Sequence, residues 1–290
     1  MSIYRTVRRR LALPIITAAG ILAVAVPLAS SGAVQSASAA GHRAAFVTTD
    51  KFHPTVAITK DGTKLADSQS DNWSGYNQGI LDTEKPFSSV SGQWVVPKAT
   101  QHTAGQAEDS ATWIGIGGGC LNSSCDASDS TLIQAGTEQD VSATGVASYD
   151  AWYEIIPAPE IESTITVHPG DVIDTAISST AGALWKINLT DKTDGQSFTE
   201  TLPYSSDEST AEWIEETPTE ISTSPGLAAL PNLSKVRFTD ATANGVNPNL
   251  VADQAMQLVD SAGDPIATPS APVKGDKFND CAWATSCAAP

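Results

Sequence analysis

The sequence is short of the side chains that most hydrolases use as bases and nucleophiles. Its 290 residues include four histidines, His42, His53, His102 and His168. No Gly-x-Ser-x-Gly, His-Glu-x-x-His or Asp-Thr/Ser-Gly motif is present. Two of the histidines fall within residues 40–70, and His168 precedes a Pro-Gly turn signal, so we interpret it as a turn residue. Carboxylates therefore remain as the plausible acid and base groups.

Positive charge is also scarce. The chain holds 16 Lys and Arg against 33 Asp and Glu, and four of the basic residues lie in the first forty positions. The rest of the chain carries 12 basic and 33 acidic residues, a net charge of −21. Such a surface repels phosphate groups, so we expect no nucleic-acid partner. Both solubility and adaptation to acid would explain this composition, and the sequence does not separate them.

Long apolar runs are confined to the N-terminus. Four arginines between positions 5 and 10 precede an apolar run over Leu11–Ala29, and small residues follow it. This is the layout of a cleaved export signal, and Pro14 and Pro27 argue against a membrane span. We predict a secretion signal over residues 1–39, a secreted, extracellular product and no membrane association after the signal is removed. The choice between the general and the twin-arginine export route stays open.

The four cysteines lie in the exported part as two close pairs, Cys120 with Cys125 and Cys281 with Cys287. An even count in an oxidising compartment indicates two disulfides, and four cysteines allow three pairings. We favour the two local pairings, each of which closes a small loop. A zinc tetrathiolate is disfavoured, because the second gap exceeds the usual spacing of about two to four residues. We expect no metal and no other cofactor.

Beyond the signal, the chain divides into two parts. Residues 40–70 are polar and read as a short pro-segment or N-terminal arm, and residues 71–290 read as one domain. Thr, Ser, Val, Ile and Trp are frequent there, turn residues recur about every ten positions, and helical periodicity is missing, which predicts an all-β sandwich or barrel. The predicted strands are Ser91–Val96, Thr112–Ile116, Leu132–Ala135, Ala151–Ile156, Thr164–Val167, Val172–Ser178, Leu184–Leu189, Ala211–Glu215, Lys235–Thr239 and Ala255–Val259.

Seven short motifs follow one another along the domain. They are Asn72–Tyr76, Ser91–Pro97, Ala111–Gly118, Leu132–Gly136, Tyr149–Glu154, Pro169–Asp171 and Ala211–Glu216. In this order and at this spacing they resemble the glutamic peptidases, or eqolisins, over the region from Asn72 to about Thr239. One such motif is weak evidence, whereas seven in order are strong. The resemblance implies a lectin-like sandwich of two antiparallel sheets with a substrate groove across the concave sheet.

The resemblance also implies a catalytic pair. The family's catalytic glutamine falls on Gln134, and its glutamate falls on Glu216 rather than on Glu212. A glutamate can still accept a proton in acid, where a histidine base is already protonated, and a glutamine amide keeps its donors at any pH. The expected function is a secreted acid endopeptidase, most simply a monomer, that hydrolyses protein or peptide substrates by activating water. The candidates for substrate binding are Trp113, Asp150, Glu154 and, more weakly, Glu138.

Strand parity and departures from the family pattern mark the neighbourhood of this pair. In extended strands Leu132 and Gln134 share one face, and Glu212, Ile214 and Glu216 share another. The chain has Gly117 where the fungal members have Asp. Glu215 replaces an expected apolar residue, which would place a second carboxylate near Glu216. Ile155 and Ile156 replace aromatic residues, which predicts a changed groove.

Two other functions fit parts of the sequence. A secreted carbohydrate-binding protein or glycosidase on the same sandwich would use tryptophan stacking and two acids such as Glu154 and Glu216, but it would not need Gln134. A binding domain without catalytic activity is the third hypothesis.

Overall fold

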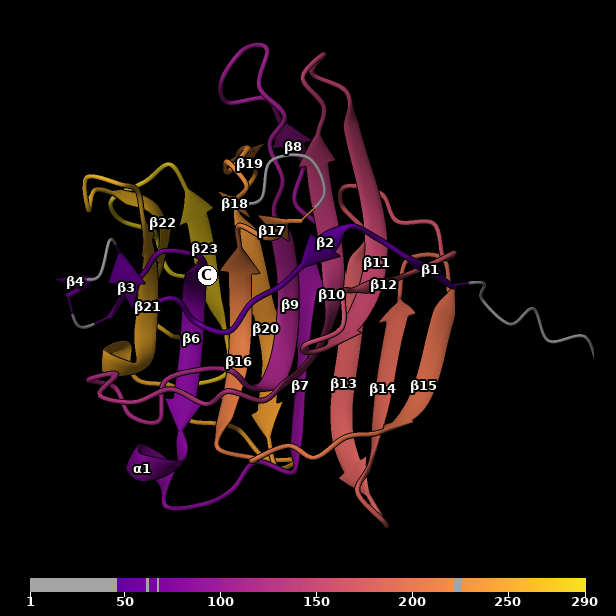
Figure 1. Cartoon of the computed structure of the whole chain (residues 1–290), viewed down its shortest axis with the longest axis vertical. Coiled ribbons are helices and arrows are strands. Elements are labelled where there is room, and N and C mark those ends of the chain that lie inside the picture. The colour runs from indigo at the N-terminus through magenta and orange to yellow at the C-terminus, as the bar shows by residue number, and fades with distance from the viewer. Residues whose placement is uncertain (1–45, 61–62, 67, 222–225) are drawn as a thin grey trace, which may run out of the picture. The chain divides into compact units, whose positions relative to one another are not determined.

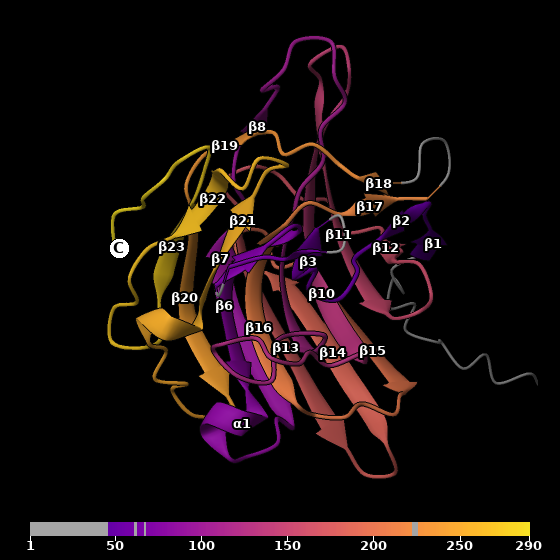
Figure 2. The ribbon, with the colours of Figure 1, turned by 60° about the vertical axis from the view of Figure 1, so that its left-hand side comes forward.

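Alternating apolar and polar side chains build two stacked β-sheets from most of the chain (Figures 1 and 2). The computed structural model describes residues 46–290 except 61–62, 67 and 222–225. The predicted signal, residues 1–39, and the first part of the 40–70 segment lie outside the described residues. The described residues belong to one compact unit that spans residues 42–290.

The first layer has the order β1-β12-β11-β10-β9-β16-β6-β21. Its strands are β1 Phe46–Thr48, β12 Ile161–Ser163, β11 Ala147–Ile155, β10 Leu132–Val141, β9 Ala111–Gly117, β16 Thr210–Glu216, β6 Trp73–Gly79 and β21 Ala255–Val259. Hydrogen bonding continues from β21 into the second layer, β22-β23-β20-β7-β13-β14-β15. These strands are β22 Pro265–Pro269, β23 Phe278–Ala282, β20 Val236–Ala243, β7 Ser89–Val95, β13 Val172–Thr180, β14 Leu184–Asp191 and β15 Ser197–Pro203.

Short elements complete the described part. They are β5 Gln69–Ser70, β2 Lys51–Phe52 with β17 Thr219–Glu220 and β18 Gly226–Leu227, β3 Thr59–Lys60 with β4 Thr63–Lys64, β8 Ala99–Thr100 with β19 Asn232–Leu233, the helix α1 Ile80–Thr83 and the 3₁₀ turn η1 Ala252–Gln254. Every strand pair is antiparallel except β5 with β21. The prediction of an all-β sandwich of antiparallel sheets is confirmed.

The main core lies between the two layers. It includes Tyr76, Trp94, Ile114, Ile133, Ile177, Trp213 and Phe238. Strands β7 and β13 alternate between buried and half-buried residues, as expected of strands that bury one face. In contrast, β6, β9 and β16 are buried at every position. The outer face of the first layer must therefore be covered as well.

A second apolar cluster lies on that outer face. Its members include Trp73, Trp113, Leu132, Trp152, Ile214 and Met256, together with Val56 from outside the sandwich strands. We call Thr49–Ala57 the N-terminal segment. It runs across the front of the first layer, where its indigo trace passes before β10, β9, β16 and β6 (Figure 1). The segment thus covers the tryptophans at the centre of the sheet.

Most predicted strands are present with boundaries shifted by a few residues, but one prediction is wrong. The chain at Thr164–Val167 is irregular, because β12 already ends at Ser163. Ile165 and Val167 are nevertheless buried in the main core, so their alternation reflects burial without strand pairing. Both local disulfides, Cys120–Cys125 and Cys281–Cys287, are present as predicted. No helix among the described residues has the length and apolar character needed to cross a bilayer.

Candidate active site

Strand register brings one polar side chain from each of several strands to the outer face of the first layer. Gln134 of β10 pairs with Glu154 of β11 on one side and with Gly115 of β9 on the other. Leu132 belongs to the outer cluster, and Ile133 belongs to the core between the sheets. The face shared by Leu132 and Gln134 is therefore the outer one, as strand parity predicts.

Glu216 ends β16 on the same face and is held by three N–H donors. Its Oε2 accepts a hydrogen bond from Trp113 Nε1 at 2.7 Å. Its Oε1 accepts from Trp73 Nε1 at 3.2 Å and from Asn72 Nδ2 at 3.4 Å. Burial raises the pKa of Glu216, and hydrogen bonds from His53, Trp113 and Trp73 oppose that rise. The result is a fully enclosed carboxyl group whose pKa lies above its usual value.

A glycine makes room for the indoles beside this carboxylate. Gly136 lies between Trp113 of β9 and Trp152 of β11 in the sheet register. A Cβ atom at residue 136 would lie 2.5 Å from the Trp113 Cβ, which is too close. Trp113 also packs edge-on against Trp73, with ring centroids 4.9 Å apart. Trp113 therefore positions Glu216, in addition to forming part of the floor of the site.

Gln134 directs its amide group at the N-terminal segment. Its Nε2 donates to the backbone oxygen of His53 at 2.8 Å and to Glu154 Oε2 at 2.6 Å. The Glu154 carboxyl group also accepts from the backbone N–H of His53, at 3.2 Å. Burial raises the pKa of Glu154 well above its usual value. The Gln134 Oε1 atom is buried and has no hydrogen-bond partner among the described residues.

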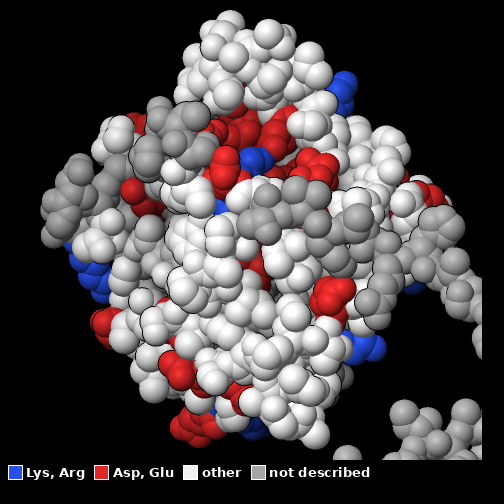
Figure 3. Space-filling model, turned by 45° about the vertical axis from the view of Figure 1, so that its right-hand side comes forward, with Lys and Arg blue, Asp and Glu red and all other residues white. Residues whose placement is uncertain are grey.

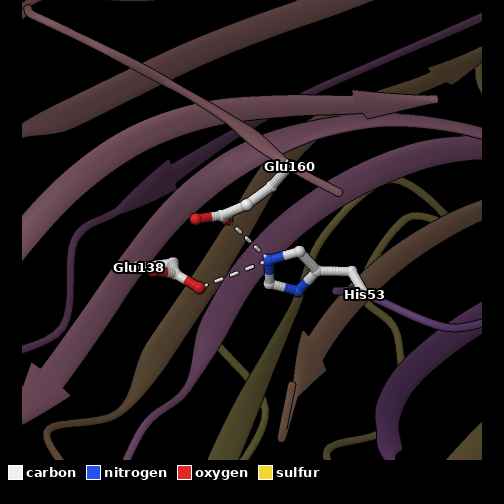
Figure 4. Close-up of side chains that lie close together, drawn as sticks. All are labelled: His53, Glu138 and Glu160. Carbon is white, nitrogen blue, oxygen red and sulfur yellow. Dashed lines mark hydrogen bonds and ion pairs between the residues drawn. The ribbon is translucent and has the colours of Figure 1, made fainter. Parts of the chain in front are cut away.

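His53 lies at the centre of the site, surrounded by carboxyl groups (Figure 4). Its Nε2 is 2.9 Å from Glu160 Oε2 and 3.3 Å from Glu138 Oε1, and its Nδ1 is 3.3 Å from Glu216 Oε2. The ring stacks on Trp152 with the two planes almost parallel, at a centroid distance of 3.8 Å. Burial disfavours the charged ring, but hydrogen bonds to Glu138, Glu160 and Glu216 raise the pKa of His53 well above its usual value. The three carboxyl groups thus favour the imidazolium form of His53.

An acidic hollow adjoins the histidine. It has a volume of about 400 Å³ and is lined by Glu138, Asp140, Asp150, Glu160, Glu162 and Glu220 together with Thr49, Asp50 and Lys51. Figure 3 shows acidic side chains gathered around a basic one in a recess of this face. Lys51 Nζ donates to Glu138 Oε2 at 2.6 Å and also to Asp140. Burial raises the pKa of Glu138, but Lys51 and His53 outweigh it, so this pKa is lowered.

The other predicted residues take separate positions. Asp150 pairs with Glu138 in the sheet register, so it lies in the hollow, about 13 Å along the strands from the Gln134–Glu154 pair. Glu212 shares the outer face with Glu216 but lies under the loop at Gly119, where an added Cβ would come within 2.6 Å of its Oε1. The structure therefore brings Gln134, Glu216, Trp113, Glu154 and Glu138 together and leaves Asp150 at the edge.

Two of the departures from the family pattern, Gly117 and Glu215, have structural explanations. Gly117 has a φ of +90°, and a Cβ there would lie 2.1 Å from the Thr131 backbone oxygen, so no side chain fits. Glu215 points away from the site, into the space between the sheets, where Thr112 Oγ1 donates to its Oε2 at 2.6 Å. The expectation of a second carboxylate beside Glu216 at this position is therefore wrong. Side chains alternate along a strand, so neighbours in sequence face opposite sides.

His53, Glu138 and Glu160 also have the spacing of a metal site. Their nearest ligand atoms all lie within 4.8 Å of one another. However, Lys51 already pairs with the second oxygen of Glu138, and the His53 ring touches a third carboxylate, that of Glu216. These contacts fit a protonated histidine, which cannot bind a metal, better than a set of metal ligands.

Sequence reasoning missed His53 and Glu160. His53 falls within residues 40–70, which were set apart from the domain, so it was not considered near the catalytic pair. The one available signal is local: Lys51-Phe52-His53-Pro54 combines cationic and apolar side chains within an otherwise polar stretch. Glu160 follows β11 and carries no sequence motif.

Comparisons with known proteins find relatives over most of the domain. A profile of the Peptidase A4 family matches residues 71–281. Aspergillopepsin-2 from Aspergillus niger is 26% identical over 209 residues, which cover 63% of this chain and 69% of that protein. The structure of scytalido-glutamic peptidase with a peptide-based transition state analog has a TM-score of 0.57 and 24% identity, covering 73% of this chain and 98% of that one. Aspergilloglutamic peptidase from Aspergillus niger has a TM-score of 0.50 and 26% identity, covering 60% of this chain and 99% of that one.

Proposed function

The chain belongs to the peptidase A4 family and is a peptide-bond hydrolase of the glutamic type, and we propose that Glu216 and Gln134 form its catalytic pair. One observation carries this proposal. The two side chains come from different strands, and both contact the same residue of a peptide that crosses the sheet, His53. The family assignment favours peptide hydrolysis over the carbohydrate-directed alternative.

Glu216 acts as the general base and then as the general acid. Its carboxylate takes a proton from water while the water oxygen attacks the carbonyl carbon of the scissile bond. When the tetrahedral intermediate collapses, the C–N bond breaks and Glu216 returns the proton to the leaving amine. The raised pKa of Glu216 suits both steps in acid, because a group transfers protons best when its pKa lies near the working pH.

Gln134 stabilises the charge that develops on the carbonyl oxygen. Its Nε2 already donates to a peptide carbonyl at 2.8 Å, the geometry that this role requires. Its buried Oε1 has a free lone pair that can orient the attacking water. A donor of this kind is typically worth about 2.7–4 kcal/mol in the transition state. Glu154 fixes the direction of the amide, and Trp113 fixes that of the Glu216 carboxylate.

We further propose that the protein is exported and acts on polypeptides outside the cell. The arginine-rich and apolar N-terminus supports export, and the two disulfides agree with an oxidising compartment. Glu138 and Asp150 form an acidic wall beside the catalytic pair, and we assign them to substrate binding together with Trp113 and Glu154. A monomer without a nucleic-acid partner remains the expectation from the strongly negative net charge.

The test is a pH profile of hydrolysis of denatured casein by the secreted protein. We expect the rate to be highest in acid. Glu216→Gln keeps the shape of the side chain and should lower the rate by roughly 10²–10⁴-fold, the usual contribution of a general base. Gln134→Ala should lower it by roughly 10²–10³-fold. An optimum near neutrality, or full activity in either variant, would rule out this catalytic pair.

A further inference from the structure

The N-terminal segment is bound along its whole length, as a peptide ligand would be. Its first part forms β2, which pairs with β17. Further on, the Val56 N–H donates to the Gly118 oxygen at 2.9 Å and the Ala57 N–H donates to Asn72 Oδ1 at 2.8 Å. Backbone hydrogen bonds to an extended chain are the means by which many proteins hold a peptide. The segment therefore occupies the cleft in the manner of a substrate.

The contacts of Gln134 fix the register of this peptide. In the proposed mechanism the Gln134 amide binds the oxygen of the scissile carbonyl, and here it binds the backbone oxygen of His53. Glu216 contacts the ring of His53. Asn72 links Glu216 to the next residue of the segment, because its Nδ2 lies 3.4 Å from Glu216 Oε1 and 3.4 Å from the backbone oxygen of Pro54. The peptide bond presented to the catalytic pair is consequently the one between His53 and Pro54.

We infer that the N-terminal segment is a built-in, substrate-like inhibitor whose His53–Pro54 bond occupies the position of the scissile bond, and that Pro54 protects this bond from hydrolysis. The inference rests on the proposed roles of Gln134 and Glu216. It makes a segment of the same chain a ligand of the active site.

Proline protects the bond through its ring. The nitrogen of an X-Pro bond carries a ring carbon where other residues carry a hydrogen, and the ring fixes the backbone angle φ. Glu216 must deliver a proton to this nitrogen for the C–N bond to break, and the ring crowds that approach. Proline also keeps the preceding residue extended, which suits a peptide lying in a cleft.

Two cationic side chains hold the segment in this register. His53 and Lys51 are two residues apart, and between them they contact four carboxyl groups of the cleft, those of Glu138, Asp140, Glu160 and Glu216. In a buried site the removal of one partner is costly, because it leaves the other charge without a counter-charge. The cations thus anchor the peptide while the proline prevents its turnover.

The decisive variant is Pro54→Ala in the full exported chain. After incubation in acid, intact-mass and N-terminal analysis should show cleavage between residues 53 and 54, with water adding to the His53 carbonyl carbon and a proton to the new amine. The wild-type chain should remain uncut at this bond. Thr55→Ala is the matched control, because it alters the neighbouring residue of the segment and keeps the proline. Pro54→Ala combined with Glu216→Gln should not be cut there.

Synthetic peptides with the sequence of residues 49–57 give a second measurement that does not depend on folding of a variant. Added to the acid-incubated secreted enzyme, the native peptide should inhibit casein hydrolysis competitively and be recovered intact. The peptide with alanine in place of proline should be cut after its histidine.

The outcomes distinguish this inference from the function on which it rests. If the enzyme digests casein but cuts neither Pro54→Ala nor the alanine peptide after the histidine, the register is wrong and the peptidase assignment survives. If the wild-type chain is cut between residues 53 and 54 as fast as Pro54→Ala, the protective role of proline is wrong. If casein is not digested under any condition, the catalytic pair is wrong and the inference falls with it.

Discussion

Two groups of buried carboxyls lie on opposite faces of the first sheet and are stabilised in opposite ways. The cleft carboxyls, Glu138, Glu160 and Glu216, surround the cationic side chains of Lys51 and His53. The inter-sheet carboxyls, Glu215 and Asp280, accept hydrogen bonds from hydroxyl groups instead. A buried carboxyl group can be stabilised either by a cation while it is charged or by protonation. This molecule uses the first solution in the cleft and the second between the two sheets.

Glu138 in the cleft and the inter-sheet carboxyls respond to acid in opposite directions. The inter-sheet carboxyls are already protonated in mild acid, because burial raises the pKa of Asp280 to about 7 and that of Glu215 well above its usual value. Among the cleft carboxyls, the lowered pKa of Glu138 provides stability that is present above its usual pKa and is lost as the pH falls. Burial raises the pKa of Glu160 and of Glu216, so Glu138 is the cleft carboxyl through which strong acid weakens the pairing with Lys51 and His53.

The largest expected effect concerns the inter-sheet carboxyls. A raised carboxyl pKa stabilises the fold below the unfolded value and loses that stability as the pH rises through the folded value. For Asp280, the change from 3.8 to about 7 corresponds to about 4 kcal/mol at most, and Glu215 adds to it. We expect the free energy of unfolding, measured with urea and tryptophan fluorescence, to fall by several kcal/mol between pH 4 and pH 7.

Asp280→Asn is the control for this effect, because it keeps the shape and removes the titration. Its free energy of unfolding should depend less on pH than that of the wild type, with the difference concentrated between pH 4 and pH 7. A variant with the same pH dependence as the wild type would show that Asp280 is not among the groups responsible.

The next effect concerns the cleft carboxyls. His53→Ala leaves Glu138, Glu160 and Glu216 facing one another without the imidazolium, which should weaken docking of the N-terminal segment by about 3–5 kcal/mol. At pH 7 the Val56 and Ala57 amides should then exchange with deuterium roughly 10²–10³-fold faster, up to the rate of the free segment. In the wild type, protection of the same amides, corrected for intrinsic exchange, should fall only below about pH 4.5, as Glu138 becomes protonated.

The groups that face His53 are Glu138 from β10, Glu154 from β11, Glu216 from β16 and Glu160 before β12. Thr55→Ala, which leaves all of them paired, should keep the protection. Faster exchange in Thr55→Ala as well would mean that the segment is held by its backbone alone. The cleft carboxyls would then not hold the segment through its cationic side chains, and they would no longer contrast with the inter-sheet carboxyls.

The sequence predicts the residues on the outer face of the first layer better than it predicts the segment that covers this face. Motif order places Gln134 and Glu216, and the two-residue period of a strand puts each on a definite face, so both reach the outer side of the sheet. The same period separates Glu215 from Glu216, although the motif makes them neighbours. The position of His53 follows from a contact between parts of the chain 81 residues apart, which no local pattern encodes.

Core burial explains the remaining differences between prediction and structure. Ile165 and Val167 alternate as strand residues do, yet they enter the core from irregular chain. Strand β6 contains Gly75, Asn77 and Gln78 and offers little apolar alternation, yet it is a fully buried strand of the first layer, between β16 and β21. Strand signals report burial on one face, and they fail where both faces are covered.

A smaller effect tests whether Glu154, which also lies beside His53, contributes to the chemistry. Glu154→Ala removes the acceptor that orients the Gln134 amide, and a lost hydrogen bond of this kind costs about 1–3 kcal/mol. We expect kcat to fall by roughly 10–100-fold with little change in KM. Glu154→Gln should recover part of the rate, because its side-chain oxygen can still accept. Asp150→Asn, at the edge of the hollow, should change KM instead, and an equal loss of kcat in that variant would contradict the positioning role.

The smallest effect concerns the hydroxyl group that donates a hydrogen bond to each inter-sheet carboxyl. Thr112→Val is nearly isosteric and removes the hydrogen bond from Thr112 Oγ1 to Glu215 Oε2. Because one hydrogen bond is lost and no charge is left unpaired by the change, the loss should be about 1 kcal/mol in the free energy of unfolding at pH 4, far less than the loss of a cation in the cleft. In a Glu215→Met background the same substitution should have almost no effect. Equal losses in both backgrounds would assign the cost to packing around Thr112, and the difference between the two faces would then rest on the cleft cations alone.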